Sequence, residues 1–193
     1  MNSASKRRVA VIGGGAGGLC AAIAAAEQGA AVTIYERQNR VGKKLLKTGN
    51  GRCNLTNENL TPGDYNHPDF VAPQLAACDT AALRAFFASL GLWTVSDSEG
   101  RVYPRSDTAA SVLDVLRLRC AALGVAEECS RELTGLKKRG ERWRLRFREG
   151  DTAECDAVIL AAGGGVDLVS SLGHSAVPFS PILCPLRTEA APV

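Results

Sequence analysis

Short apolar runs alternate with longer amphipathic runs along the chain, an order typical of α/β proteins. The short runs are rich in aliphatic and β-branched residues, as in buried strands of a parallel sheet. They lie at residues 8–12, 31–35 and 156–162, and a further parallel strand is expected at residues 125–129 because it follows a predicted helix. The longer runs predict helices that each end at a glycine, over residues 19–28, 80–90 and 109–123. Together they predict strands and helices that follow one another in a Rossmann-like order.

Two of the predicted helices carry an apolar face and an N-cap residue. Asp79 is placed to cap the helix at 80–90, and Ser106 or Asp107 the helix at 109–123. Apolar residues recur at helical spacing in both and form one face of each helix. These positions are Leu83, Phe86, Phe87, Leu90, Val112, Leu116, Cys120 and Leu123. In the helix at 80–90 this face is expected to pack in the core rather than to contact a cofactor.

The remaining segments predict loops and antiparallel strands. Residues 54–77 are rich in Asn, Thr, Pro, Gly and Asp, so we expect a loop there. Residues 93–95 and 101–103 are expected to form a hairpin. Residues 142–148 alternate strictly between arginine and apolar side chains. A nucleic-acid surface is one interpretation, but nearby acidic residues favour a meander strand with one solvated face.

A glycine-rich turn joins the first predicted strand to the first predicted helix. Gly13, Gly15 and Gly18 fit the spacing G-x-G-x-x-G, and Glu36 ends the second strand 23 residues after Gly13. In this motif the first glycine makes a tight turn, the second lets a pyrophosphate approach the backbone, and the third lets helix and strand pack closely. The helix N-terminus attracts the phosphates, and the acid binds ribose hydroxyls. A carboxylate there repels a 2′-phosphate, so the pattern predicts a site for FAD or NAD rather than NADP.

A basic, glycine-rich segment follows the acid. Residues 40–54 contain three glycines and five cationic side chains, which suits a loop that folds over a pyrophosphate or reaches a flavin ring. A solvated basic loop is the alternative from residue types alone. Three more glycines, Gly163 to Gly165, follow the strand predicted at 156–162. Because ligands bind outside the carboxyl ends of parallel strands, both glycine clusters should lie at the same edge of the sheet.

These stretches resemble a known family. The strings VAVIGGGAGGLCAAIAAAEQGAAVTIYER and RVGKKLLKTGNGRCNLTN, with AFFASLGLWTVSDSEGRVYPRSDTAASVLDVL and DAVILAAGGG, are similar to the BaiN-like NAD(P)/FAD-dependent oxidoreductases, also called the aminoacetone oxidase family of FAD-binding enzymes. The resemblance covers residues 8–186 and implies non-covalently bound FAD, with a reduced nicotinamide as possible electron donor. The implied fold is Rossmann-like and three-layered, with a parallel sheet and a small antiparallel meander.

The resemblance also implies the residues that bind FAD. It implies that the glycine turn binds the pyrophosphate. It further implies that Glu36, with Arg37 beside it, binds the adenosine ribose and that the backbone of Leu133 contacts adenine. The segment after Glu36 falls along the diphosphate and flavin, and the second glycine cluster completes the site. The cofactor-binding residues implied are Gly13, Gly15, Ala16, Gly18, Glu36, Arg37, Lys43, Lys44, Thr48, Gly49, Gly51, Arg52, Asn54, Leu133, Ala162, Gly163 and Gly164.

The chain departs from the family pattern near its end. Family members continue into a substrate-side domain, whereas this sequence stops at Val193, and the loop expected after Gly164 is shortened. We therefore expect the N-terminal part of an FAD-binding domain, incomplete relative to the family. Its expected segments are a βαβ unit with the flavin loop (1–54), a helical and hairpin insertion (55–124), strands with the meander and second glycine cluster (125–165), and the truncated start of a further segment (166–193).

Net charge and cysteine content limit the partners, metal sites and location expected for this chain. A formal net charge of +3 gives no argument for nucleic acid or an anionic membrane, so we expect neither. The seven cysteines have no C-x-x-C spacing and no histidine cluster, so we expect reduced thiols, no metal site and a cytoplasmic location. Cys53 is expected to be structural, and His67 and His174 receive no role. The oligomeric state is not predicted.

The function expected is that of an FAD-binding oxidoreductase that passes hydride from a reduced nicotinamide through FAD to an organic substrate or oxygen. No acid–base residue stands out, so the catalytic residues stay unknown, as does the substrate. Two alternatives remain open. One is a truncated, non-catalytic remnant with weak or no nucleotide binding, and the other is a module that binds NAD alone.

Overall fold

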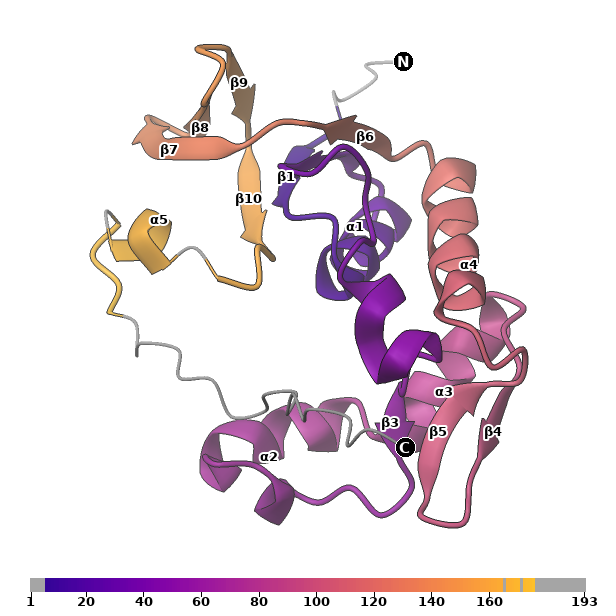
Figure 1. Ribbon diagram of the computed structural model, residues 1–193. Helices are drawn as coiled ribbons and strands as arrows, with labels where there is room; N and C mark the ends of the chain where they lie inside the picture. Colours follow the sequence, from indigo (N-terminus) through magenta and orange to yellow (C-terminus); the bar gives the residue numbers. More distant parts are fainter. Residues whose placement is uncertain (1–5, 165, 171, 176–193) are drawn as a thin grey trace, which may run out of the picture. The chain divides into compact units, whose positions relative to one another are not determined.

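The computed structural model describes residues 6–164, 166–170 and 172–175. The chain divides into two compact units, Met1–Gly163 and Gly164–Val193. The first unit contains every strand found in the described residues, and the following paragraphs concern it. Figure 1 shows its elements in sequence colours.

A four-stranded parallel sheet forms the centre of the first unit, as the apolar runs predict. Its strands are β1 (Arg8–Ile12), β2 (Ala31–Glu36), β6 (Ala126–Cys129) and β10 (Ala157–Leu160). They are hydrogen-bonded in the order β10-β1-β2-β6, and all pair in parallel. The prediction that the last strand is buried is wrong in part. β10 lies at an edge of this sheet, its residues are only partly covered, and Leu160 is 36% exposed.

Helices cover one face of this sheet. They are α1 (Ala16–Glu27) and α4 (Ala109–Ala122). Alternate residues of the strands, Val9, Val11, Val32 and Ile34, join their buried side chains in one apolar core. The helical residues in this core include Leu19, Ile23, Val112, Leu116 and Cys120. The apolar face predicted for residues 109–123 is therefore confirmed.

An antiparallel meander packs on the opposite side of the sheet. It consists of β7 (Leu133–Arg139), β8 (Arg142–Phe147) and β9 (Thr152–Cys155), paired in that order. The ring of Phe147 lies 4.8 Å from that of Tyr35, whose side chain leaves β2 on the face opposite Ile34. Arg148 pairs with Glu132 at 2.8 Å, and Arg142 with Glu154 at 3.8 Å. These pairs confirm the predicted strand with a solvated, charge-balanced face, and the third layer of the fold.

A second antiparallel sheet lies in the insertion. Its strands are β3 (Thr56–Asn57), β5 (Arg101–Pro104) and β4 (Thr94–Ser96), in that order. The predicted hairpin is confirmed, with β3 as an additional strand. Helix α3 (Thr80–Ser89) precedes it, and the carboxylate of Asp79 caps this helix by accepting a 2.7 Å bond from the N–H of Ala82.

The structure corrects two predictions in the insertion. Residues 54–77 are not all loop, because they contain the 3₁₀ turn η2 (Pro62–Asp64) and helix α2 (Pro68–Ala77). Helix α2 tolerates a proline at its first position, where no N–H partner is needed. The N-cap of α4 is Thr108, whose hydroxyl accepts a bond from the N–H of Ala110, and neither Ser106 nor Asp107 fills this role. Asp107 instead has a left-handed backbone and binds Arg52 through its carboxylate.

The second unit contains one short helix among its described residues, α5 (Val166–Ser170). The segment predicted to follow the second glycine cluster is thus helical at its start, while residues 176–193 lie outside the described part. None of the helices formed by the described residues is long and apolar enough to cross a membrane.

Candidate dinucleotide-binding site

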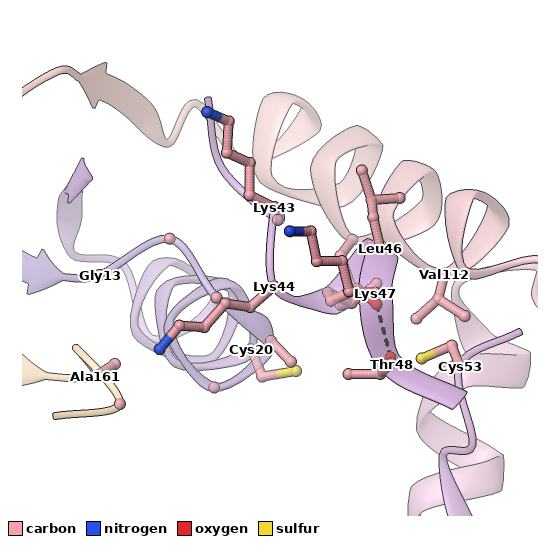
Figure 2. Close-up of a pocket in the computed structure, with 18 of the residues that line it drawn as sticks. Gly13, Cys20, Lys43, Lys44, Leu46, Lys47, Thr48, Cys53, Val112 and Ala161 are labelled. Atoms are coloured by element: carbon pink, nitrogen blue, oxygen red, sulfur yellow. Dashed lines mark hydrogen bonds between the residues drawn. The ribbon is translucent and has the colours of Figure 1, made fainter. Parts of the chain in front are cut away.

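A cavity of about 1080 Å³ opens at the carboxyl edge of the parallel sheet in the first unit. It lies among the turn between β1 and α1, the end of β2, the segment after it and the end of β10 (Figure 2). Its volume is at the upper end of the range for small-molecule and cofactor sites. Gly163, the first residue of the second glycine cluster, lines the same cavity as the glycine turn, as expected from the rule for carboxyl ends of parallel strands.

The glycines of the first turn have distinct environments. Gly13 has φ +107°, and a Cβ atom there would lie 2.6 Å from the carbonyl oxygen of Ala161. A Cβ atom on Gly18 would lie 1.8 Å from the carbonyl oxygen of Gly13. Gly15 and Gly17 differ, because a Cβ atom on either would meet nothing within 4 Å. Gly13 and Gly18 are therefore required by packing, while Gly15 and Gly17 leave open space beside the N-terminus of α1.

Glu36 closes one side of the turn from the end of β2. Its carboxylate accepts a 2.7 Å bond from the N–H of Gly14 and a 2.8 Å bond from the N–H of Gln38. A carboxylate has about four acceptor sites, so these bonds fix its orientation and leave acceptor capacity for hydroxyl groups. The side chain lines the cavity at the position predicted for the ribose acid.

Cationic side chains outnumber acidic ones around the cavity. The five that line it are Arg37, Arg40, Lys43, Lys44 and Lys47, whereas Glu36 is the sole acid in the lining. Lys44 extends toward the glycine turn and Ala161, and a Cβ atom on Gly163 would lie 3.8 Å from its Nζ (Figure 2). The ion pairs between described residues include none of the three lysines. The cavity is therefore suited to an anionic ligand.

The other end of the cavity is apolar. It is lined by side chains from η1 (Leu45–Gly51), α3 and α4, together with the residue before β3. These residues are Leu45, Leu46, Leu55, Leu83, Phe87, Val112 and Leu116. A ligand with both phosphates and an aromatic ring matches a cavity with one cationic and one apolar end.

Two thiols line the cavity, and neither is set up as a nucleophile. Burial raises the pKa of the Cys20 thiol to about 11, with Cys78 adding to the shift. Burial also raises the pKa of Cys53, although a hydrogen bond from Thr48 opposes the shift. With raised pKa values, both cysteines are protonated at neutral pH. Since the thiolate is the reactive form, neither acts as a nucleophile there. This agrees with a structural role for Cys53.

The structure brings most of the predicted site residues to the cavity. Those that line it are Gly13, Gly15, Ala16, Glu36, Arg37, Lys43, Lys44, Thr48, Asn54, Ala162 and Gly163. Gly18 lies under the turn, Gly49 and Gly51 shape the backbone of η1, and Leu133 is buried at the start of β7. Gly164 belongs to the second unit.

Arg52 lies away from the cavity lining. Its Nε donates a 2.6 Å hydrogen bond to Oδ1 of Asp107, and its guanidinium lies 4.1 Å from the centre of the Tyr103 ring. The bond to Asp107 raises the pKa of Arg52 above its ordinary value. Its neighbours Cys53 and Asn54 do line the cavity.

Some lining residues were not predicted. Arg40 and Lys47 belong to the basic segment, so its charge pattern contained a signal for them. Cys20 lies four residues after Ala16 on α1 and thus on the same helix face, which helical spacing could have indicated. Leu83 and Phe87 of α3 pack in the core as expected, but they also line the cavity, which the sequence analysis did not predict. This placement depends on a tertiary contact that no local pattern reports.

Fold and site together define a Rossmann-type dinucleotide-binding domain, with the glycine turn, helix N-terminus and strand-end acid in their expected places. The chain belongs to the HI0933-like family, since residues 7–177 match the model of the HI0933-like protein Rossmann domain. This confirms the family resemblance stated from the sequence motifs. Family and fold agree on a Rossmann-type domain.

Curated relatives agree with this assignment. The chain is 40% identical to the 3-dehydro-bile acid delta(4,6)-reductase of Clostridium scindens, over 96% of this chain and 48% of that protein. It is 28% identical to the ribosomal RNA dihydrouridine synthase of Haemophilus influenzae, over 88% of this chain and 42% of that protein. The chain thus spans about half the length of the curated relatives it matches.

Solved structures support the fold. Thermovibrio ammonificans THI4 matches with a TM-score of 0.60 at 17% identity, covering 86% of this chain and 61% of that one. NikD, described as an unusual amino acid oxidase, matches with a TM-score of 0.53 at 18% identity, covering 87% of this chain and 55% of that one. At such identities the likeness concerns the fold alone.

Proposed function

We propose that this chain is the cofactor-binding part of an FAD-dependent oxidoreductase. The single observation that carries the proposal is the open space over Gly15 and Gly17, where a Cβ atom would meet nothing within 4 Å. Side chains are missing there at a helix N-terminus that faces a cationic cavity, which is the environment a pyrophosphate requires. The residues present therefore fit a dinucleotide.

We assign the two ends of FAD by chemistry. Glu36 would bind the ribose hydroxyls of the adenosine half, with Arg37 beside it, and the backbone of Leu133 would lie near adenine. The backbone N–H groups of the turn would hold the pyrophosphate. The residues proposed to contact the diphosphate and flavin half are Lys43, Lys44, Thr48, Asn54, Ala162 and Gly163.

When bound, FAD would accept a hydride from a reduced nicotinamide and pass it to an acceptor. The names of both curated relatives point to an acceptor class: a delta(4,6)-reductase and a dihydrouridine synthase each act at a carbon–carbon double bond. We therefore propose an organic acceptor with a conjugated double bond, with oxygen as the alternative acceptor. A cytoplasmic location remains a prediction from the cysteine content.

This chain's own residues bind and orient the cofactor in this proposal. The cations neutralise the diphosphate, the carboxylate of Glu36 selects a ribose without a 2′-phosphate, and the apolar end keeps water from the ring. The thiols of Cys20 and Cys53 have raised pKa values, so neither serves as a thiolate nucleophile in this proposal.

Binding of FAD to the purified chain tests the proposal. We expect protein that is yellow as isolated, or that takes up added FAD in a saturable titration of flavin fluorescence. A module for NAD alone would bind NAD and not FAD, and a non-catalytic remnant would bind neither. Either result would overturn the proposed function. A Gly15→Val variant is the matched control for binding at the turn.

A further inference from the structure

The most distinctive segment of the sequence contains an arginine that turns away from the cavity. Arg52 is followed by Cys53 and Asn54, which line the cavity, and is preceded by Thr48, which also lines it. Its own side chain lies on Tyr103 and binds Asp107. We propose that Arg52 is a positioning residue that fixes the loop of residues 48–54 against β5 and the start of α4, and so holds the FAD site in shape. This inference rests on the proposed function.

The loop needs an external anchor because its backbone is strained. Gly49, Asn50, Gly51 and Cys53 all have positive φ values, of +53°, +54°, +87° and +60°. Asparagine tolerates this left-handed conformation, but for Cys53 it is uncommon and persists only where the surroundings fix it. Inside the loop, the N–H of Arg52 binds the carbonyl of Gly49 and the N–H of Cys53 binds that of Thr48. Both bonds depend on the position of Arg52.

The partners of Arg52 are held firmly. Tyr103 is 7% exposed and lies on β5, the central strand of its sheet, which pairs with β3 on one side and β4 on the other. Asp107 precedes Thr108, the N-cap of α4, and its N–H donates to the carbonyl of Pro104. The contact therefore joins the loop to two regular elements across 55 positions of sequence.

Because the side chains of Arg52 and Asp107 are partly exposed to solvent, their contact is expected to position the loop without adding much to the stability of the whole fold. The side chains of Arg52 and Asp107 are 47% and 59% exposed. Pairs of such exposure add little to the stability of a fold. We therefore expect the loss of the contact to appear in the loop and in FAD affinity, while the thermal midpoint of the whole chain changes little.

The change in FAD affinity caused by Asp107→Ala distinguishes a positioning role for Arg52 from direct contact with phosphate. If Arg52 positions the loop, Arg52→Ala weakens FAD binding by about tenfold and Asp107→Ala weakens it by as much or less, because it leaves the contact with Tyr103. The double variant is no weaker than Arg52→Ala, because Asp107 acts only through Arg52. If Arg52 binds the cofactor directly, Asp107→Ala frees the guanidinium and leaves affinity unchanged or higher. That result, or additive losses, overturns the proposal. Arg105→Ala removes an exposed positive charge close to Tyr103 and is expected to leave affinity unchanged.

A measurement without FAD keeps the inference separate from the proposed function. Hydrogen exchange of the Arg52 and Cys53 amides should be faster in Arg52→Ala and Asp107→Ala than in the unmodified chain, with the core strands unaffected. Arg52→Lys should restore exchange only in part, since lysine lacks the planar group that lies over the ring. Unchanged exchange in both alanine variants overturns the proposal. Faster exchange in a chain that binds no FAD supports the anchor and rejects the proposed function alone.

Discussion

Individual glycines of the first turn are required for different physical reasons. Gly18 is required by packing, because its missing Cβ atom lets the carbonyl of Gly13 approach α1. Gly15 is not required by packing, because open space lies over it. The same residue type thus serves the fold at one position and the ligand at another, three residues away.

Substitution at these two glycines should give opposite results. Gly15 has φ −81° and ψ −173°, which valine tolerates, so Gly15→Val should fold normally and lose FAD affinity by about a hundredfold, because its side chain fills the ligand space. Gly18→Ala should lower the free energy of unfolding by roughly 1–3 kcal/mol or more, as overpacking does. Urea denaturation and FAD titration measure both effects. Wild-type affinity in Gly15→Val would place the pyrophosphate elsewhere.

Glu36 should matter for the adenosine half of the ligand alone. Glu36→Ala should weaken FAD binding by roughly 1.5–3 kcal/mol, the contribution of a hydrogen bond to a charged acceptor. FMN lacks the adenosine half, so any affinity for FMN should not change. Glu36→Gln keeps one acceptor and should lose less. Equal losses for FAD and FMN in a parallel titration would contradict the ribose role.

Cys20 should react with alkylating agents only at high pH. Its pKa is raised from 9.0 to about 11, so the thiolate fraction at pH 8 is about a hundredfold smaller than for an ordinary thiol. The alkylation rate should rise about tenfold per pH unit and level off only near pH 11. Peptide mass mapping separates Cys20 from the exposed Cys78, which should be labelled first. Equal labelling of the two at pH 8 would contradict the raised pKa.

At the level of elements, the start of α4 offers a test of a helix cap. The structure assigns this cap to Thr108, whereas the sequence pattern favours Ser106 or Asp107. Thr108→Ala should lower the free energy of unfolding by about 1 kcal/mol. Ser106→Ala is the matched control and should leave it unchanged. Urea denaturation that shows the larger loss in Ser106→Ala would put the cap at the predicted residue.

Elements with strong local signals could be predicted from the sequence, and those that depend on distant contacts could not. Strands β1, β2 and β10 follow from apolar runs, and Asp79 caps α3 as its position predicts. Helix α1 also follows from its sequence, although it begins at Ala16 rather than at residue 19. Helix α2 was missed because its two prolines and polar surroundings resemble a loop. Arg52 was assigned to the cofactor through the family resemblance, while the partner that it actually binds, Asp107, lies 55 positions away. Local periodicity contains no signal for such a contact.

The whole molecule combines a well-defined cofactor cavity with a length about half that of its curated relatives. Every residue of the cavity lining belongs to the first unit. Cofactor binding is therefore a property that this chain is expected to show by itself. Substrate reduction also requires a site for the acceptor beside the flavin ring.

Titration of the purified chain with FAD, followed by flavin fluorescence and by the visible spectrum, tests the central claim most directly. We predict saturable binding of one FAD per chain, strongly reduced in Gly15→Val and unaffected in Arg105→Ala. A folded chain that binds no FAD, or binds it equally well with valine at position 15, would contradict the account.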